Sequence, residues 1–215
     1  MKQSVAGMSL IVGTALTVTI AAGCAGKGET HVFNFPDKPP TAQPSGMEPV
    51  KIVIEPFEDR RTDKTHLGAR NHLWGGVTYF DVGGGQPAAM VTHTLVNRLK
   101  FRGWGERPWN VRVGQAGSAT DADIVISGQV QDLSSNAQSR VFSTVIDTKN
   151  RMTIYAKNLG DQSTTTRSIE GARTRTVFWF NEADAQELLA ATVMDGIERL
   201  IADTKIAEKA LRPVR

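Results

Sequence analysis

Asp123-Ile-Val-Ile-Ser-Gly-Gln-Val130 is the clearest β-strand in this 215-residue sequence, because β-branched apolar residues dominate it. Gly128 within it indicates either a bulge or a close approach of another group to the backbone. After a Ser/Asn turn expected at 134–137, residues 141–156 read as one long strand or two short ones, with alternating apolar and polar side chains. Residues 164–178 alternate in the same way after a turn at 158–163. The pattern predicts consecutive antiparallel strands.

Two helices complete the expected domain. The first begins at Pro87, where the missing N–H costs nothing, and keeps apolar residues at helical spacing until Gly103. The second follows Asn181, a suitable N-cap, and carries an apolar stripe as far as about residue 204. A strand at 50–54 and a short one at 111–113 add to the sheet. The order predicts an α+β fold, a mostly antiparallel sheet with two helices packed on one face.

Two segments of the domain lack a regular pattern. Residues 58–86 are rich in glycine, and we expect a long loop, which in a compact domain is usually functional or mobile. Gly83-Gly-Gly85 before Pro87 favours a hinge over a phosphate-binding loop, because no Lys-Ser/Thr pair follows. We expect the last residues, 206–215, to form a fraying tail.

The N-terminus has the pattern of an export signal. Lys2 supplies a positive start, residues 5–20 are apolar, and Ala21-Ala-Gly-Cys24 ends the segment with small residues. This resembles the bacterial lipobox, which implies acylation of the Cys24 thiol and removal of residues 1–23. An uncleaved transmembrane helix and an ordinary cysteine are the alternatives. The dilution of the segment by Gly, Thr and Ala, and the placement of the chain's single cysteine, favour the lipoprotein.

Residues 24–49 would then join the lipid to the folded domain. They are rich in proline, which favours a semi-rigid extended tether. Val32, Phe33 and Phe35 interrupt this composition and are candidates to dock on the domain, which we expect to cover 50–205. Ala25 after the cysteine, by resemblance to enterobacterial lipoproteins, implies the outer membrane and a periplasm-facing domain.

Four segments together resemble the YajG-like bacterial lipoproteins. They are residues 52–60, 95–99, 122–133 and 187–200, and the resemblance extends over most of residues 50–204. It rests on core patterns, with no catalytic signature among them. The resemblance implies a non-catalytic periplasmic domain that binds a partner, as a scaffold, transport auxiliary or assembly factor.

The composition and motifs give little support to other chemistry. Lys and Arg number 25 against 22 Asp and Glu, without a basic run, so we expect no nucleic-acid binding. His66 and His72 share a segment with Asp59 and Asp63, but their spacing matches no metal-ligand motif, and a solvated loop explains them as well. No nucleophile elbow or HExxH motif occurs. We expect no enzyme activity, metal or cofactor.

Aromatic residues are the candidates for binding. Trp74, Tyr79 and Phe80 lie in the glycine-rich segment, and Val177-Phe-Trp-Phe180 is a run that cannot all face one side of a strand. The run either packs in the core at the helix junction or forms a contact patch, where aromatics commonly dominate the binding energy. We expect Trp74, Tyr79, Phe80, Phe178 and Trp179 to contact a partner.

Two functions from different classes follow. The first is a non-catalytic binding or scaffold lipoprotein that contacts an envelope protein, and the alternative is an auxiliary that carries a lipid or another apolar ligand between membranes. A carrier requires an apolar cavity between sheet and helices, whereas a scaffold requires a filled core and a surface patch. A hydrolase is a third possibility, which would require a clustered acid, base and nucleophile.

Overall fold

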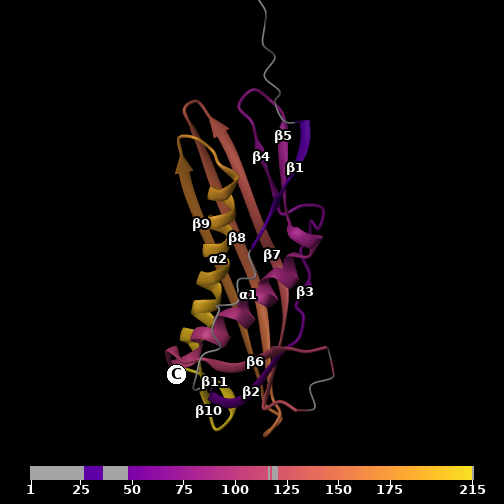
Figure 1. Ribbon diagram of the computed structural model, residues 1–215, viewed down its shortest axis with the longest axis vertical. Coiled ribbons are helices and arrows are strands. Elements are labelled where there is room, and N and C mark those ends of the chain that lie inside the picture. The colour runs from indigo at the N-terminus through magenta and orange to yellow at the C-terminus, as the bar shows by residue number, and fades with distance from the viewer. Residues whose placement is uncertain (1–26, 36–47, 116, 118–120, 215) are drawn as a thin grey trace, which may run out of the picture.

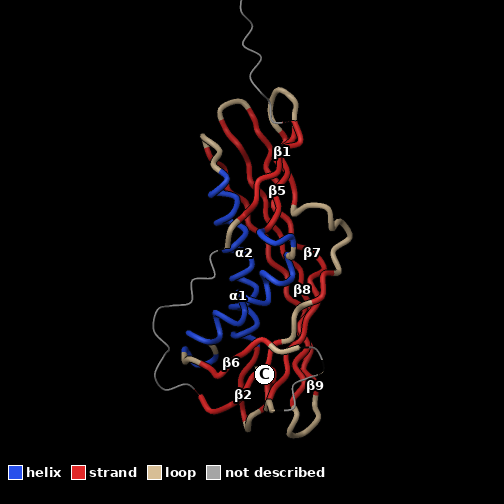
Figure 2. The backbone as a smooth tube through the Cα atoms, turned by 45° about the vertical axis from the view of Figure 1, so that its right-hand side comes forward, coloured by secondary structure: helices blue, strands red, loops and turns tan. Residues whose placement is uncertain are grey.

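The computed structural model describes residues 27–35, 48–115, 117 and 121–214. Their arrangement is an elongated two-layer domain in which a large sheet carries both helices on the same face (Figures 1 and 2). One continuous hydrophobic cluster lies between the layers and includes residues from β1 through β11. The α+β class is confirmed, and most of the residue pairs in the sheet are antiparallel.

Three long antiparallel strands dominate the sheet. They are β7 (Ile124–Arg140), β8 (Ser143–Asn158) and β9 (Thr164–Val177). The turn predicted at 134–137 is wrong, because β7 continues through it and the chain reverses at 141–142. Ser135 and Ala137 are buried on the inner face, opposite Thr148 and Ile146. Buried and exposed side chains therefore continue to alternate in β7 through this segment. Its side chains are small, so their composition resembled that of a turn.

β7 also joins the rest of the sheet. Along its second edge it pairs in succession, and always in parallel, with β2 (Glu48–Ile54), β3 (Glu58–Asp59) and β4 (Gly68–Asn71). β6 (Trp109–Val113) extends the sheet beyond β2, and β5 (Val77–Val82) followed by β1 (Lys27–Phe33) extends it beyond β4. The prediction of one long loop at 58–86 is thus wrong in part, because that segment contains the three strands β3, β4 and β5.

The helices agree with the sequence. α1 (Pro87–Arg102) follows a 3-10 turn at Gly83–Gly85 and ends at Gly103, before a second 3-10 turn at Trp104–Glu106. In α2 (Glu182–Asp203) the Asn181 side chain accepts a hydrogen bond from the backbone N–H of Ala183, as expected of an N-cap. α2 packs on β8 and β9, and α1 packs near β6 and β3. None of the described helices is both long and apolar enough to cross a membrane.

Both ends of the described chain are more ordered than the sequence predicts. Residues 27–33, expected in a tether, form β1 in parallel with β5, and Phe33 stacks on Phe80 with ring centroids 5.1 Å apart. Docking of Phe33 is confirmed, and Phe35 packs against the same core, whereas Val32 is half exposed. Residues 1–26, with Cys24, and residues 36–47 lie outside the described residues.

The C-terminal tail is a β-hairpin. β10 (Thr204–Ala207) pairs antiparallel with β11 (Ala210–Pro213), so the expectation of a fraying end is wrong. Leu211 is buried, and both its backbone N–H and its carbonyl bond to the buried side chain of Asn158. Burial of one leucine and this pair of hydrogen bonds hold the hairpin on the sheet.

Candidate functional site: an aromatic tip

Several connections meet at one end of the sheet (top of Figure 1). Asn71 pairs with Val77, so the β4–β5 turn lies there, and Arg140 pairs with Ser143, which places the β7–β8 turn beside it. Val177, the last residue of β9, pairs with Thr144 near the start of β8, so the β9–α2 connection begins at the same end. β1 starts at the same end, because Lys27 pairs with Val77.

Large apolar side chains project from these connections. Trp74 is 90% exposed in the β4–β5 turn, Phe142 is 82% exposed in the β7–β8 turn, and Trp179 is 91% exposed before α2. We call the following five residues the aromatic tip: Leu73, Trp74, Phe142, Phe178 and Trp179. Two aromatic segments that are about a hundred residues apart in the sequence therefore share one exposed surface, of the kind that marks an interaction site.

A recess of about 810 Å³ lies between these side chains. The five residues of the aromatic tip line it together with Phe180, Arg70, Arg140, His72 and small or hydroxyl residues, and none of the described lining residues is Asp or Glu. The guanidinium of Arg70 lies 4.1 Å from the centre of the Phe180 ring and donates from Nε to Ser139 Oγ. The recess is apolar with two cations at its border.

Burial lowers the pKa of two residues that line this recess. Burial lowers the pKa of His72 below its ordinary value of 6.5, and the charge of Arg70 lowers it further, so His72 is neutral at pH 7. Its Nε2 lies 2.9 Å from Thr78 Oγ1. Burial also lowers the pKa of Arg70 from its ordinary value, while the charge of Glu182 opposes this change.

Two of the predicted contact residues lie elsewhere. Phe80 is fully buried between Phe33 and Phe180, so the expectation that it contacts a partner is wrong. Tyr79 is half-buried and stacks on the ring of His66, with centroids 4.3 Å apart, and does not line the recess. Both outcomes follow from β5, where Thr78, Phe80 and Val82 alternate as the buried face.

Phe142 was not predicted as part of the site. Sequence reasoning placed the reversal of β7 six residues too early, and so assigned Phe142 to a strand. The signal that could have located it is the exposed apolar pair Val141-Phe142 between the polar residues Arg140 and Ser143. Its backbone φ of 64° is also uncommon for a bulky residue.

The residues that were considered for metal binding make other contacts. Within the described ranges, His, Cys, Asp and Glu form no group of three that could hold a metal ion. Asp59 binds Arg61 through both carboxylate oxygens, Asp63 accepts from the backbone N–H of Thr65, and the Nδ1 of His66 lies 3.7 Å from Asp81. These contacts fix local structure.

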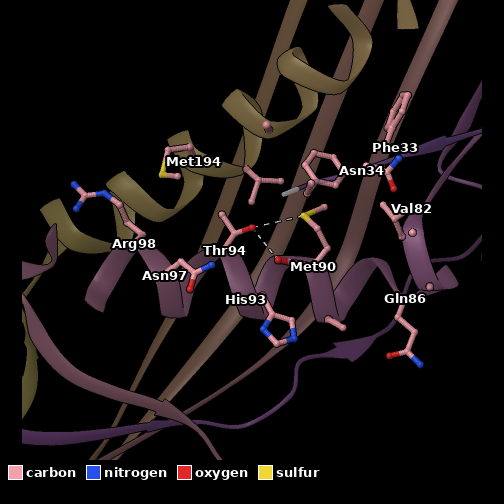
Figure 3. A pocket seen from close by; sticks show the side chains of 16 residues that line it. Phe33, Asn34, Val82, Gln86, Met90, His93, Thr94, Asn97, Arg98 and Met194 are labelled. Carbon is pink, nitrogen blue, oxygen red and sulfur yellow. Dashed lines mark hydrogen bonds between the residues drawn. The ribbon is translucent and has the colours of Figure 1, made fainter. Parts of the chain in front are cut away.

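An open groove of about 670 Å³ runs between α1 and α2 (Figure 3). Phe33, Phe35 and Val193 give it apolar surface, and a polar border is formed by Gln86, His93, Asn97 and Arg98. Arg98 is paired with Glu198 on α2 through two hydrogen bonds of 2.6 and 3.0 Å. This groove is the nearest counterpart of the cavity that a carrier would require.

No family model and no curated protein matches the chain, so the resemblance to YajG-like lipoproteins stays a prediction. Three solved structures show a partial likeness. Protein XCC0632 from Xanthomonas campestris, of family DUF330, is 11% identical, with a TM-score of 0.48 over 82% of this chain and 91% of that one. The PelC dodecamer from Paraburkholderia phytofirmans is 13% identical, with a TM-score of 0.38 over 71% and 91% of the two chains. Lipoprotein GNA1162 from Neisseria meningitidis is 10% identical, with a TM-score of 0.35 over 70% and 99%. Likeness at this level does not indicate function.

Proposed function

We propose that this chain is an envelope lipoprotein, anchored through Cys24 in the outer membrane, whose domain is a non-catalytic binding or scaffold module. The observation that carries the proposal is the aromatic tip, in which three connections present four exposed aromatic rings side by side. The lipobox-like sequence ending at Cys24 supports the anchor.

The size of the exposed rings supports binding. Each aromatic side chain buries about 150–250 Å² when covered. Covering the four exposed rings would therefore contribute on the order of 15 kcal/mol before the costs of association. An isolated exposed apolar residue needs no explanation, but a contiguous group of this size on the surface of a domain does.

The groups around the recess favour binding over turnover. His72 is its single histidine, and the Nε2 of that ring is engaged with Thr78. The described lining offers no carboxylate that could orient His72 as a general base toward Ser139 or Thr144, and Ser139 accepts a hydrogen bond from Arg70. The side chains that line the recess are therefore suited to binding a partner and not to catalysing a reaction.

The anchor can be tested in growing cells. We expect a labelled fatty acid to enter the wild-type protein and not Cys24→Ser, with Ala25→Ser as a control that keeps the label. Ala25→Asp should move the protein from the outer to the inner membrane fraction. Label that survives Cys24→Ser would refute the anchor, and an unchanged membrane distribution of Ala25→Asp would refute outer-membrane sorting by this residue.

Occupancy of the aromatic tip can be tested with single thiols, because Cys24 is the only cysteine. Phe178→Cys reports on the tip, and Leu159→Cys in the β8–β9 turn at the other end of the strands is the matched control. We expect a maleimide to label both positions in detergent-purified protein, but only the Leu159→Cys position in permeabilised cells. Equal labelling of Phe178→Cys in both states would show that the tip is unoccupied.

A carrier of apolar ligands is the second candidate, favoured by the groove between α1 and α2. Its openness and its polar border make it less suited to enclosing an apolar molecule than the cavities such carriers use. Lipid that copurifies with wild type and is lost from Met90→Arg, at the groove, would support the carrier. The same loss from Trp74→Ala would instead locate the lipid at the aromatic tip.

A further inference from the structure

We propose that the aromatic tip binds the surface of the bilayer that holds the protein's own lipid anchor, with the rings of Trp74, Phe142, Phe178 and Trp179 at the level of the headgroups. This inference rests on the proposed function, because a bilayer lies next to this end of the domain only if Cys24 is acylated.

The path of the chain brings the anchor and the tip together. Lys27 pairs with Val77, and Trp74 precedes Val77 by three residues in the adjoining turn. Cys24 precedes Lys27 by only three residues. Three extended residues span about 11 Å at most, so an acylated Cys24 holds the start of β1 close to the membrane. The described domain therefore cannot stand far from the bilayer, and the end that it presents there is the aromatic tip.

The residue types fit the boundary between lipid and water. Trp combines a large apolar ring with an N–H donor, and it is enriched where one side of a protein is apolar and the other wet. Both exposed Trp residues of the chain lie in the tip, whereas Trp104 and Trp109 are buried in the core, with 5% and 7% of their surface exposed. The tip rings project from turns, whose polar backbone groups can remain hydrated while the rings enter the interface.

The charges are complementary to a lipid surface as well. Arg70 and Arg140 border the recess, and no acidic residue is among its described lining residues. Anionic headgroups attract such cations. Acyl chains on Cys24 would hold the protein at the bilayer but leave the domain free to turn, so a second contact beside the anchor fixes its orientation.

The predicted orientation places the other end of the domain far from the membrane. β8 runs for 16 residues from the tip to the β8–β9 turn at Leu159, a distance of about 50 Å for a strand of that length. Side chains near Leu159 are therefore beyond the reach of the bilayer, which provides an internal control.

The four Trp residues make the proposal measurable. The lipidated protein is purified from membranes and reconstituted into vesicles of phosphatidylethanolamine and phosphatidylglycerol with or without brominated acyl chains, which quench nearby Trp emission. The variants are Trp74→Phe, Trp179→Phe and the double variant, which keep aromatic bulk at the tip. Leu159→Trp in the double-variant background is the distant control, and flotation with the vesicles reports on the anchor independently.

We expect brominated vesicles to quench wild type, each single variant to be quenched less, and the double variant and its Leu159→Trp derivative not to be quenched. Failure to float would refute the anchor and with it the proposed function. Flotation without any quenching of wild type would overturn the membrane contact alone, and is the result expected if the tip binds a protein. Equal quenching of the double variant or of Leu159→Trp would also overturn it.

Discussion

Gly128 leaves space on the face of the sheet for a buried aromatic ring. A Cβ at this position would lie 2.7 Å from the ring of Phe57, which is itself buried. The sequence predicted a bulge or a close approach here, and the close approach is confirmed, while the register shift occurs between Val130 and Asp132. Glycine is needed at 128 because a buried ring occupies the space of its side chain.

We therefore predict that Gly128→Ala lowers the free energy of unfolding by about 1–3 kcal/mol, as overpacking of a filled core does. Gly160→Ala is the control, since a Cβ there meets nothing within 4 Å. Urea unfolding followed by circular dichroism measures both. Equal stability of the two variants would mean that Phe57 moves aside without cost.

At Phe142, in contrast to Gly128, we expect a substitution not to lower the stability of the fold. Its φ is 64° and its side chain is 82% exposed, so it occupies a left-handed position without packing in the core. Asn tolerates this conformation better than a bulky aromatic residue. We predict that Phe142→Asn leaves the free energy of unfolding unchanged or raises it by about 1 kcal/mol, while weakening the contact of the tip. A clear loss of stability on urea unfolding would show that the ring supports the fold.

At the residue level, side-chain type was informative about exposure. Trp74, Phe178 and Trp179 were singled out as candidate contact residues, and the structure places them exposed along one recess, while their contact with a partner stays a prediction. Tyr79 and Phe80 needed more than type, because their orientation depends on the register of β5 in the sheet. A register is set by the partner strand, which the local sequence does not contain.

At the scale of elements, the C-terminal hairpin depends on one buried amide. Asn158 accepts from the N–H of Leu211 at 2.8 Å and donates to the carbonyl of the same residue at 3.2 Å. Removing this side chain leaves the buried N–H of Leu211 without its partner, whereas the carbonyl keeps a hydrogen bond from Thr165 Oγ1 at 2.9 Å.

We predict that Asn158→Ala lowers the free energy of unfolding by about 1–3 kcal/mol, the cost of one buried group left unsatisfied. Gln131→Ala is the matched control, because its amide makes one exposed bond to Thr153 and its loss should cost less than about 0.5 kcal/mol. Hydrogen exchange should locate the loss of Asn158→Ala in β10 and β11. Unchanged protection there would refute this role.

The β8–β9 turn is joined to the same hairpin by charge. Hydrogen bonds from Ser163, and the guanidinium of Arg212 on β11, lower the pKa of Asp161 from 3.8 to about 2. A carboxyl whose pKa is lower in the folded state stabilises the fold above its unfolded pKa. This contribution is lost as the pH falls from 3.8 towards 2.

We predict that stability falls less steeply between pH 4 and pH 2 for Asp161→Asn than for wild type, while Arg212→Met flattens the curve in part. Thermal unfolding at a series of pH values measures the difference. Parallel curves for wild type and Asp161→Asn would show that the carboxyl is not coupled to folding.

Prediction of elements succeeded where the signal is local. The limits of α1 and α2 follow from Pro87, Gly103 and Asn181, which act within one helical turn. β1, β3, β4 and β5 were missed, because the partners that hold these strands lie elsewhere in the chain. The hairpin β10–β11 was missed because its strands are only four residues long and directly follow a long helix.

At the scale of the whole molecule, β1 makes the N-terminal segment part of the core. Phe33 is 1% exposed and stacks on Phe80, whereas the preceding Val32 is 50% exposed. We predict that Phe33→Ala lowers the free energy of unfolding by about 3–5 kcal/mol, and Val32→Ala by less than about 1 kcal/mol. Chemical denaturation measures both. A similar small effect for the two would mean that β1 is dispensable, and that the lipid is joined by a longer tether.

The sequence predicted the class of the fold but not its topology. The alternating strands after residue 123 and the two amphipathic helices were sufficient for an α+β domain. The parallel pairing of β2 with β7 and β6 was not predictable, since these strands are separated by 50 residues or more in the chain. The aromatic tip depends on the same topology, because only the assembled sheet brings its three connections to one end.

The position of β7 as the common partner of β2, β3 and β4 has a consequence for biogenesis. These three segments lie within residues 48–71, yet the strand that joins them is formed by residues 124–140. A chain that is synthesised from its N-terminus must hold Val50-Lys-Ile-Val-Ile54 unpaired with β7 while some seventy further residues are made, which takes about 4–14 s at about 5–20 residues per second. The apolar segment of β2 can therefore complete its pairing only once the central strand is present, so assembly of the sheet waits for residues 124–140.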